Sequence, residues 1–344
     1  MTCHLTMPVA RWCPLCSCWY KPHMGERSGL GLVDLALLSA IEECGSPPDR
    51  PHTKCAKVIG SVDEGLGLAY GYAYLALCDL AKPWILKPLL VDYHGDLGTR
   101  DTPSAAMRLT ECRLSRAGAC ALAAERGEIG PIPLGLILGN AHLTGYQPPF
   151  DGHDVLGALR LILEDPLIPD DDLIAAIGMP SFPTGSNVLG DFGSLAKGEW
   201  TTFTLQAQLT VDETTSDVIV ECLPPECSPA RLAQILLGQY QPDSMKDEED
   251  LDASELEIAG LVASVTVQSS LTGDRLVCTP TAGVSAERFL GHLQTVREIT
   301  TEVFLKLPLP LAAMLRAWVV HWEDEDLVTS FELLEASIDE ENAG

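Results

Sequence analysis

Phosphate recognition is the chemistry that best fits the cationic side chains in the first third of the chain. The segment AAMRLTECR places Arg108 and Arg113 close together, with Glu111 between them. A guanidinium can hold a phosphate through two parallel hydrogen bonds. The alternative is an ion pair between Arg108 and Glu111 or a nearby aspartate, which would be a structural role only. The residues alone leave both interpretations open.

Lys54 and Lys57, in KCAKVIG, add two more cations within a stretch whose apolar spacing predicts a helix. On a helix that faces DNA they would contact phosphates, whereas lysines of this kind more often form a solvated face. Lys54, Lys57, Arg108 and Arg113 are therefore the candidate phosphate-binding residues.

Metal binding is the second chemistry that residue spacing suggests. CPLCSC, residues 13–18, has ligand-like spacing, and His4 and His23 flank it. A zinc site needs a second pair of ligands at a defined distance, and none follows. The acidic run at 247–252 fits a solvated loop better than it fits a metal or a basic partner. We predict no metal site in this chain.

The elements that must position these residues fall into two parts. The 344 residues allow about two domains, and 46% hydrophobic residues exclude a mainly disordered chain. Helical periodicity over 28–45, 52–62 and 72–81, followed by the strand-like LLVDYHGDLG, predicts a helix-turn-helix domain with a wing. Beyond residue 126, two strand-strand-helix units predict a four-stranded sheet covered by helices. The small apolar residues at 129–139 predict a buried strand.

The expected fold class is α+β, with four segments. Residues 1–24 form a tail without periodicity that we expect to be disordered, and 25–126 form the winged-helix domain. Residues 127–316 form the sheet domain, and 317–344 form a C-terminal helix with a frayed acidic tail. The longest apolar run, 66–78, is well short of the ~20 residues that span a bilayer. The N-terminus lacks a signal-peptide pattern, so we expect a cytoplasmic protein.

The charge is unevenly distributed along the chain. Residues 1–126 hold 13 of the 22 Lys and Arg and 13 of the 49 Asp and Glu, so residues 127–344 hold the remaining 9 and 36. The whole net charge of −27 therefore lies in the second part. Because tight DNA binding needs cations that displace counterions from phosphates, we expect weak or absent binding to duplex DNA.

Motifs along the chain resemble the A subunit of bacterial DNA gyrase and topoisomerase IV, the type IIA topoisomerases. KCAKVIG (54–60) resembles the entry to the recognition-helix region of that family. LLVDYHGDLGTRDTPSAAMRLTECRLS (89–115) resembles the segment that carries the catalytic tyrosine. The tower domain and its approach are similar to PPFD (148–151), EDP (164–166), IGMPSFPTG (177–185) and LPPECSPARLAQI (223–235). Together the motifs cover about residues 27–316.

The resemblance implies a winged-helix domain followed by a tower-like domain, in a family that cuts both DNA strands through a tyrosine–phosphate bond. It places Leu109 at the tyrosine position, with Arg108 beside it, and leucine has no ionisable group. The family's HPHG motif is not recognisable in EGLGLAYGYAY, and Leu35 and Ala36 stand where paired arginines are expected. We therefore assign no catalytic residue and expect no strand cleavage. The resemblance makes Lys54, Lys57, Arg108 and Arg113 the candidate DNA-binding residues.

Other tyrosines of the first domain are alternative nucleophiles. Tyr93 lies in a predicted loop and is the phenol that could replace the missing one. Tyr72 and Tyr74 have apolar helical spacing, which is more typical of core residues. His94 and Asp96 look like an acid–base pair, but they match a turn of the family and are interpreted as turn residues.

The resemblance also implies partners. They are DNA, a B-type topoisomerase subunit that would supply Mg²⁺ and ATP, and a second copy bound across the winged-helix face; this chain itself is expected to hold no cofactor. The predicted function is that of a truncated, degenerate gyrase A-like protein with residual DNA or subunit binding. The alternative is an acidic interaction protein or DNA mimic that modulates a topoisomerase. Whether the chain is an enzyme stays open.

Overall fold

The computed structural model describes residues 27–66, 69–139, 147–225, 227–240, 258, 260–270, 273–294, 296, 299–322 and 325–343. The predicted tail at 1–24, with its CPLCSC motif, and the acidic run at 247–252 lie outside the described residues. Within the described part, no helix has the length and apolar character needed to cross a membrane.

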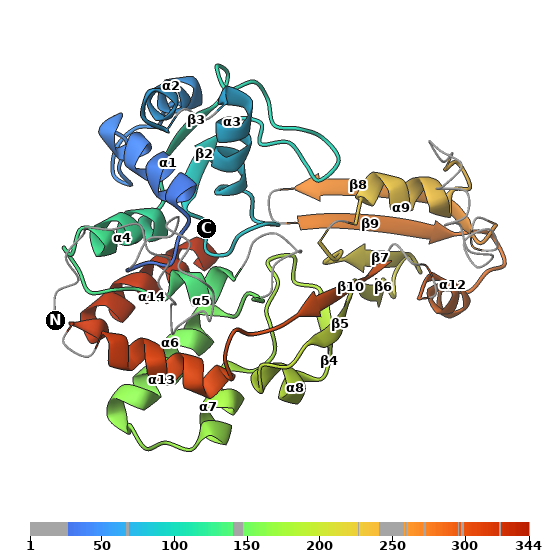
Figure 1. The fold of residues 1–344 in the computed structure, drawn as a ribbon. Coiled ribbons are helices and arrows are strands. Elements are labelled where there is room, and N and C mark those ends of the chain that lie inside the picture. Colours follow the sequence, from blue (N-terminus) through green and yellow to red (C-terminus); the bar gives the residue numbers. More distant parts are fainter. Residues whose placement is uncertain are drawn as a thin grey trace.

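Three helices and a small sheet form one end of the molecule (Figure 1). The helices are α1 (Leu32–Glu43), α2 (Cys55–Leu66) and α3 (Tyr70–Asp79). The sheet has the order β1-β3-β2, with both pairings antiparallel, and consists of β1 (Thr53–Lys54), β2 (Val91–His94) and β3 (Glu111–Leu114). In α1, Leu37, Leu38 and Ile41 are fully buried because their spacing places them on one helix face.

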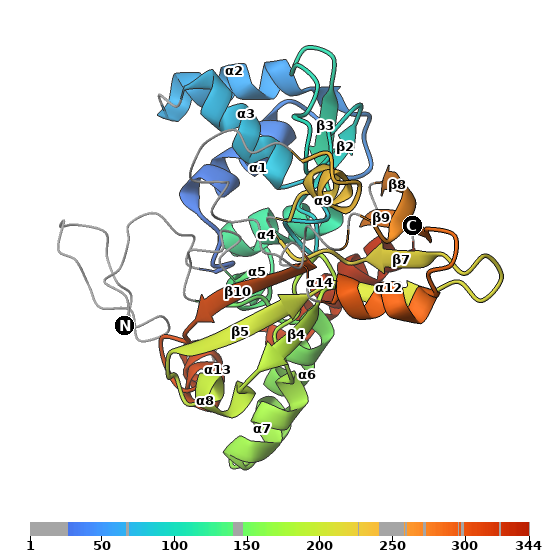
Figure 2. The same cartoon turned by 90° about the vertical axis from the view of Figure 1, so that its right-hand side faces the viewer.

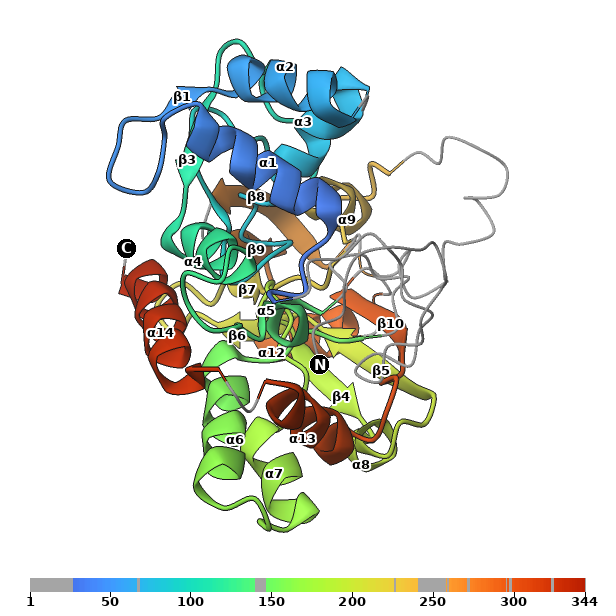
Figure 3. The same ribbon diagram turned by 60° about the vertical axis from the view of Figure 1, so that its left-hand side comes forward.

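A second group of helices lies below the first and includes the C-terminal end of the chain. It contains α4 (Arg116–Glu125), α5 (Leu134–Leu138), α6 (Gly152–Glu164), α7 (Asp170–Ile177), α13 (Leu311–His321) and α14 (Leu327–Ala343). Helix α14 packs on α4 and α6, although it lies far from both in sequence (Figure 3). Helix α6 begins at the Asp151 cap, whose carboxylate accepts hydrogen bonds from His153 N and Asp154 N at 2.9 and 3.4 Å.

Two further antiparallel sheets complete the fold. The first has the order β10-β5-β4 and lies beside α8 (Phe192–Ala196) in Figure 2; its strands are β4 (Asn187–Gly190), β5 (Thr201–Gln206) and β10 (Thr300–Leu305). The second has the order β6-β7-β9-β8, with β6 (Gln208–Val211), β7 (Val218–Glu221), β8 (Val262–Ser270) and β9 (Gly273–Pro280). Helices α9 (Pro229–Leu236) and α12 (Ala286–Leu293) pack on this second sheet.

The four-stranded sheet confirms the predicted pair of strand-strand-helix units. The first unit is β6-β7-α9 and the second is β8-β9-α12. The two helices begin in the same way, because Ser228 accepts from Arg231 N at 2.9 Å and Ser285 accepts from Arg288 N at 3.2 Å. A serine cap satisfies an N–H group that the first helical turn would otherwise leave unpaired.

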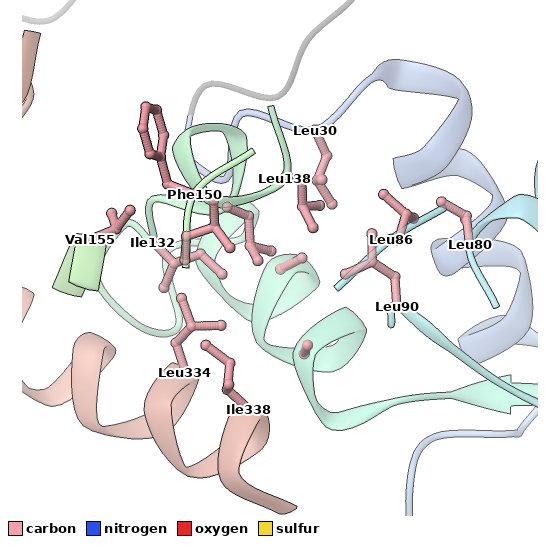
Figure 4. Close-up of a cluster of buried hydrophobic side chains, with 14 of the residues drawn as sticks. Leu30, Leu80, Leu86, Leu90, Ile132, Leu138, Phe150, Val155, Leu334 and Ile338 are labelled. Atoms are coloured by element: carbon pink, nitrogen blue, oxygen red, sulfur yellow. The ribbon is translucent and has the colours of Figure 1, made fainter. Parts of the chain in front are cut away.

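Two hydrophobic cores hold these elements together. The first contains buried side chains from Leu30 to Leu205 and again from Val303 to Ile338, and the second contains those from Ala207 to Ile299. Figure 4 shows part of the first core, where Leu334 and Ile338 of α14 approach Ile132. Helices α5–α8, α13 and α14, which follow residue 126, therefore share a core with α1–α3. The cores divide near residues 206 and 300, whereas the sequence pattern placed a boundary at 126/127.

Several expectations about local structure differ from the observed fold. Tyr93, expected in a loop, lies in β2 and pairs with Cys112 of β3. The segment 129–139 is buried as predicted, but it contains the short helix α5 rather than a strand. Its buried residues Leu134, Ile137 and Leu138 have helical spacing, and the left-handed Gly139 ends the helix. The predicted frayed tail is also wrong, because α14 is a helix whose Phe331, Leu334 and Ile338 are buried.

Candidate nucleic-acid interface

The hairpin between β2 and β3 presents Arg108 and Leu109 on a turn that ends where β3 begins. The N–H of Leu109 donates to Ala106 O at 2.8 Å, which closes the turn, and the following Thr110 is fully buried. Arg108 is exposed and the Leu109 side chain is 64% exposed. Among the residues that the structure describes, none forms a hydrogen bond or ion pair with the Arg108 side chain. Its guanidinium is therefore free to meet a ligand.

Lys54 and Glu111 form a cross-strand pair on the same small sheet. Lys54 Nζ lies 3.0 Å from Glu111 Oε1, and His94 Nδ1 lies 3.6 Å from Glu111 Oε2. The hydrogen bond and charge of Lys54 lower the pKa of the Glu111 carboxyl. The sequence interpretation put Lys54 on a helix, but it lies in β1, where it pairs with Glu111 of β3. The charge of Lys54 is thus compensated within the chain.

Arg113 is compensated in the same way. Its Nε donates to Asp92 Oδ2 at 2.6 Å, and its Nη1 donates to the carbonyl oxygen of Arg50 at 3.3 Å. His52 Nε2 lies 3.3 Å from Asp92 Oδ1 on the other side of that carboxylate. On this face of the sheet the cations Lys54 and Arg113 are balanced by the carboxylates of Glu111 and Asp92. These four side chains therefore carry no net positive charge.

Lys57 lies apart from this sheet face, in the first turn of α2. Its Nζ donates to the carbonyl oxygen of Cys44 at 3.2 Å, after the end of α1. Three of the four predicted DNA-binding residues thus have partners inside the chain. Arg108 differs from Lys54, Lys57 and Arg113 because no described residue neutralises it. The ion pair between Arg108 and Glu111, one of the two interpretations that the residues left open, is not formed.

Tyr93 and Tyr74 meet behind the turn. Their hydroxyl oxygens are 2.8 Å apart, and the Tyr74 hydroxyl also donates to Ala105 O at 2.5 Å and lies 3.1 Å from Thr110 Oγ1. Burial raises the pKa of the Tyr93 hydroxyl well above its usual range. A phenol that attacks phosphorus must lose its proton, so this environment disfavours Tyr93 as a replacement nucleophile.

Helix α3 lacks the cations that a DNA-facing helix would use. Its sequence YGYAYLALCD contains no lysine or arginine. Tyr74 is half-buried, as predicted for a core residue, but Tyr72 and Leu75 are exposed. The exposed side of α3 is thus aromatic and aliphatic rather than basic.

The loop between β2 and β3 is anchored to the four-stranded sheet by two residues that sequence reasoning missed. Arg100 Nε lies 2.9 Å from Asp274 Oδ2, and its Nη1 donates to the carbonyl oxygens of Leu223 and Pro224 at 3.0 and 2.9 Å. The Arg100 and Asp274 side chains are only 8% and 6% exposed. Burial lowers the pKa of the Arg100 guanidinium, and Asp274 opposes that shift.

Asp101 extends this anchor to the start of α9. Its carboxylate accepts a hydrogen bond from Ala230 N at 2.9 Å and another from the hydroxyl of Ser228, the helix cap. An anion at this position also interacts favourably with the positive end of the helix dipole. No local signal could have identified this anchor, because TRDT has only the composition of a turn and its partners lie more than 120 residues away.

The predicted turn residues divide between the turn and the strand. Asp96 Oδ1 accepts from Gly98 N at 2.9 Å, which confirms Asp96 as a turn residue. His94 ends β2 beside Glu111 instead. Within the described ranges, no group of three or more His, Cys, Asp or Glu side chains could hold a metal ion.

Comparison with known proteins finds relatives that are similar to about half of this chain. Residues covering 48% of the chain are 30% identical, over 192 aligned residues, to the DNA gyrase A protein of Streptococcus pneumoniae serotype 4. They are 33% identical over 196 residues to the DNA gyrase A protein of a Synechocystis species, and 29% identical over 192 residues to that of Streptococcus pyogenes serotype M3. Over that half, the chain is type IIA topoisomerase A-subunit-like.

The similarity has clear bounds. The match spans 23%, 22% and 23% of these three relatives, so it covers less than a quarter of each of them. No protein-family model matches the A-subunit-like chain. The activity and partners of the whole gyrase A protein can therefore only be proposed for this chain.

Proposed function

We propose that this chain is a gyrase A-like protein that keeps a winged-helix scaffold and has lost strand cleavage. The α1–α3 group with the β1-β3-β2 sheet would be the winged-helix domain, and the four-stranded sheet with α9 and α12 would correspond to the tower. The observation that carries the proposal is Leu109, an exposed leucine beside the unpartnered Arg108, where the family resemblance expects the nucleophile. A hydrocarbon side chain cannot form the tyrosine–phosphate bond.

The residual ligand under this proposal is DNA, bound weakly. Arg108 would contact a phosphate, whereas Lys54, Lys57 and Arg113 would first have to leave their intramolecular partners. Opening each surface pair costs up to about 1 kcal/mol, which offsets much of what a phosphate contact would contribute. Binding should therefore be weak at physiological salt and should depend on a single free guanidinium.

A B-type topoisomerase subunit is the protein partner that the gyrase A similarity suggests. Such a subunit would bring Mg²⁺ and ATP, and the residues described above would present the DNA-facing surface to it. A second copy across the winged-helix face, as the resemblance implies, would involve α3. Its exposed Tyr72 and Leu75 suit a protein contact better than a phosphate contact.

Trapping of covalent adducts tests the loss of cleavage. The full chain, a Leu109→Tyr variant and a Leu109→Phe control are each incubated with supercoiled plasmid, Mg²⁺ and a gyrase B subunit, then denatured with detergent. We expect no protein–DNA adduct in any sample, because positioning groups act as a unit and one phenol does not restore them. Adducts with the unaltered chain would overturn the proposal. Adducts with Leu109→Tyr alone would show that the positioning groups survive.

A gel-shift series at several salt concentrations tests residual DNA binding. Arg108→Gln should weaken binding and reduce the salt slope by about one, since one phosphate contact releases about one counterion. The matched control is Arg288→Gln. Arg288 is exposed on α12, a helix that packs on the second core and lies outside the candidate interface. An equal effect of both variants would show that Arg108 acts only through net charge. Nanomolar affinity at physiological salt would contradict weak binding.

An acidic interaction protein, or DNA mimic, is the second candidate. The uneven charge favours it, because residues 127–344 carry 36 acidic and only 9 basic side chains. Such a chain would compete with DNA for a basic surface of a topoisomerase. The two candidates separate in one assay: a DNA mimic inhibits DNA binding by the purified topoisomerase and makes no DNA complex of its own, whereas a residual DNA-binding protein forms a complex with DNA.

A further inference from the structure

Strand β8 is the outer strand of the four-stranded sheet, and its composition is unusual for an edge. The order β6-β7-β9-β8 leaves one side of β8 facing away from β9 (Figures 1 and 2). Its nine residues, VASVTVQSS, contain three valines and neither a charged residue nor a proline. Natural proteins commonly protect such edges with charged residues, prolines or short strands.

The other edge strands in the described part of the chain are protected by length or charge. β4 and β6 have four residues each, and β1 has two. β2 and β10 carry the charged residues Asp92 and Glu302. β8 therefore differs from them in combining length with neutrality. At about 3.4 Å per residue it offers an edge of roughly 30 Å.

Helix α9 packs on the inner face of β8 and β9, and α12 packs on β7. On β9, Leu276 and Cys278 are fully buried, and they pair with Val267 and Val265 of β8. Val267 nevertheless remains 38% exposed. On the opposite face Thr266 is exposed as well. Within the described residues, the only backbone hydrogen bonds of 263–268 are those to β9.

The net charge of the chain indicates what can pair with this edge. A copy that carries a charge of −27 is repelled by most of the surface of another copy. Residues 258–273 contain no charged side chain, so antiparallel pairing of β8 with itself brings no like charges together. An antiparallel edge is also self-complementary in its hydrogen bonds under a two-fold axis.

We propose that β8 is a homodimer interface, in which two copies pair antiparallel about a two-fold axis near Thr266 and form a continuous eight-stranded sheet. Thr266 is the central residue of the strand, so it would face its own counterpart, and Val265 would face the partner's Val267. The occupant of this edge is a second copy of this chain. This interface is separate from the winged-helix face.

Sedimentation velocity of the full chain tests the proposal. The unaltered protein should form a species of twice the chain mass with rising concentration. Thr266→Lys places two ammonium groups opposite each other and should raise the dimer dissociation constant by about tenfold or more. The control is Thr279→Lys, on the exposed face of β9. Thr279 pairs with Ser264, which lies on the same face of the sheet as Thr266, but β9 is an inner strand and not an edge. This variant should dimerise normally.

Hydrogen exchange provides a second measurement that does not depend on any substitution. Backbone amides within 263–268 should exchange more slowly as the dimer forms, while those of β6, at the other edge, should not change. A monomer at all concentrations would overturn the proposal. A dimer that Thr266→Lys leaves intact would also overturn it, and is the result expected for a dimer that forms through the α3 face. Equal dissociation by Thr279→Lys would also overturn it, since it would indicate a face rather than an edge. Circular dichroism confirms that each variant is folded.

Discussion

Replacing Asp274 with alanine should be among the most destabilising single changes in the chain. The carboxylate is 6% exposed and lies 2.9 Å from Arg100 Nε, and Arg100 is itself only 8% exposed. In Asp274→Ala the guanidinium stays buried with two carbonyl partners, from Leu223 and Pro224, and with no anion. A buried charge that loses its counterion costs about 3–5 kcal/mol of unfolding free energy. We expect a loss of that size.

The neighbouring residue supplies a matched control. Arg275 lies next to Asp274 on β9 but on the opposite face, and it pairs with Glu221 at 3.2 Å, with both side chains more than 40% exposed. Because exposed ion pairs contribute at most about 1 kcal/mol, Arg275→Met should lower the free energy of unfolding by no more than that. The two variants thus compare a buried and an exposed ion pair on one strand.

Urea unfolding followed by circular dichroism measures both effects. A double-mutant cycle with Arg100→Met and Asp274→Ala should give a coupling energy of about 1–3 kcal/mol, since the two groups act as a pair. The reasoning fails if Asp274→Ala costs no more than Arg275→Met. It also fails if the two changes at positions 100 and 274 add without coupling, because the ion pair would then not be the source of the loss.

Three further predictions concern Tyr74, Glu341 and Leu109. Tyr74→Phe removes the hydroxyl that donates to Ala105 O and should cost about 1–2 kcal/mol in the same urea assay. The Glu341 carboxylate accepts a hydrogen bond from Leu89 N at 2.8 Å, and burial raises the pKa of this carboxyl, so its ionisation is disfavoured in the folded state. Glu341→Gln should therefore raise the melting temperature at neutral pH. The gain should vanish below about pH 4, where the glutamate is protonated in the unfolded state as well. Leu109→Ser should change stability by less than about 0.5 kcal/mol, because the side chain is 64% exposed, and a larger loss would show that Leu109 belongs to the core.

Secondary structure could be predicted where one periodicity dominated. The helix predicted over 72–81 is observed as α3, Tyr70–Asp79, within two residues at each end. The paired strand-strand-helix units were also predicted, because the same order of strands and helix occurs twice along the chain. The segment at 129–139 was misjudged, since a short apolar run does not distinguish a buried strand from a buried helix turn.

The division into cores could not be predicted from the sequence. The helices α13 and α14 return to pack on α6 and α4 across more than 140 residues, and composition carries no sign of that contact. The acidic content of α14 suggested a frayed end. Its carboxylates instead contact the other helices: Glu335 forms an ion pair with Arg160 at 2.7 Å, and Asp339 lies 2.8 Å from His153 Nε2. A charge pattern indicates solvent exposure, and it does not identify the partner of an exposed charge.

Residue types in the candidate interface were predicted more reliably than their surroundings. Arg108 and Leu109 are exposed at the end of the hairpin, where a ligand could reach them. The sequence could not show that Lys54 and Arg113 are neutralised by Glu111 and Asp92, because those pairs depend on strand register.

The loop between β2 and β3 connects the small sheet to the four-stranded sheet. Residues 95–110 leave β2 and return to β3, so Arg108 stands at one end of a segment whose middle, at Arg100 and Asp101, is fixed to the four-stranded sheet. The small sheet and the four-stranded sheet belong to different cores, and this loop holds them in one arrangement. A rigid arrangement lowers the entropy cost of contacting a large partner with both surfaces. The burial of Arg100 is therefore better explained by positioning than by stability alone, since a buried ion pair adds little stability over an apolar contact of the same size.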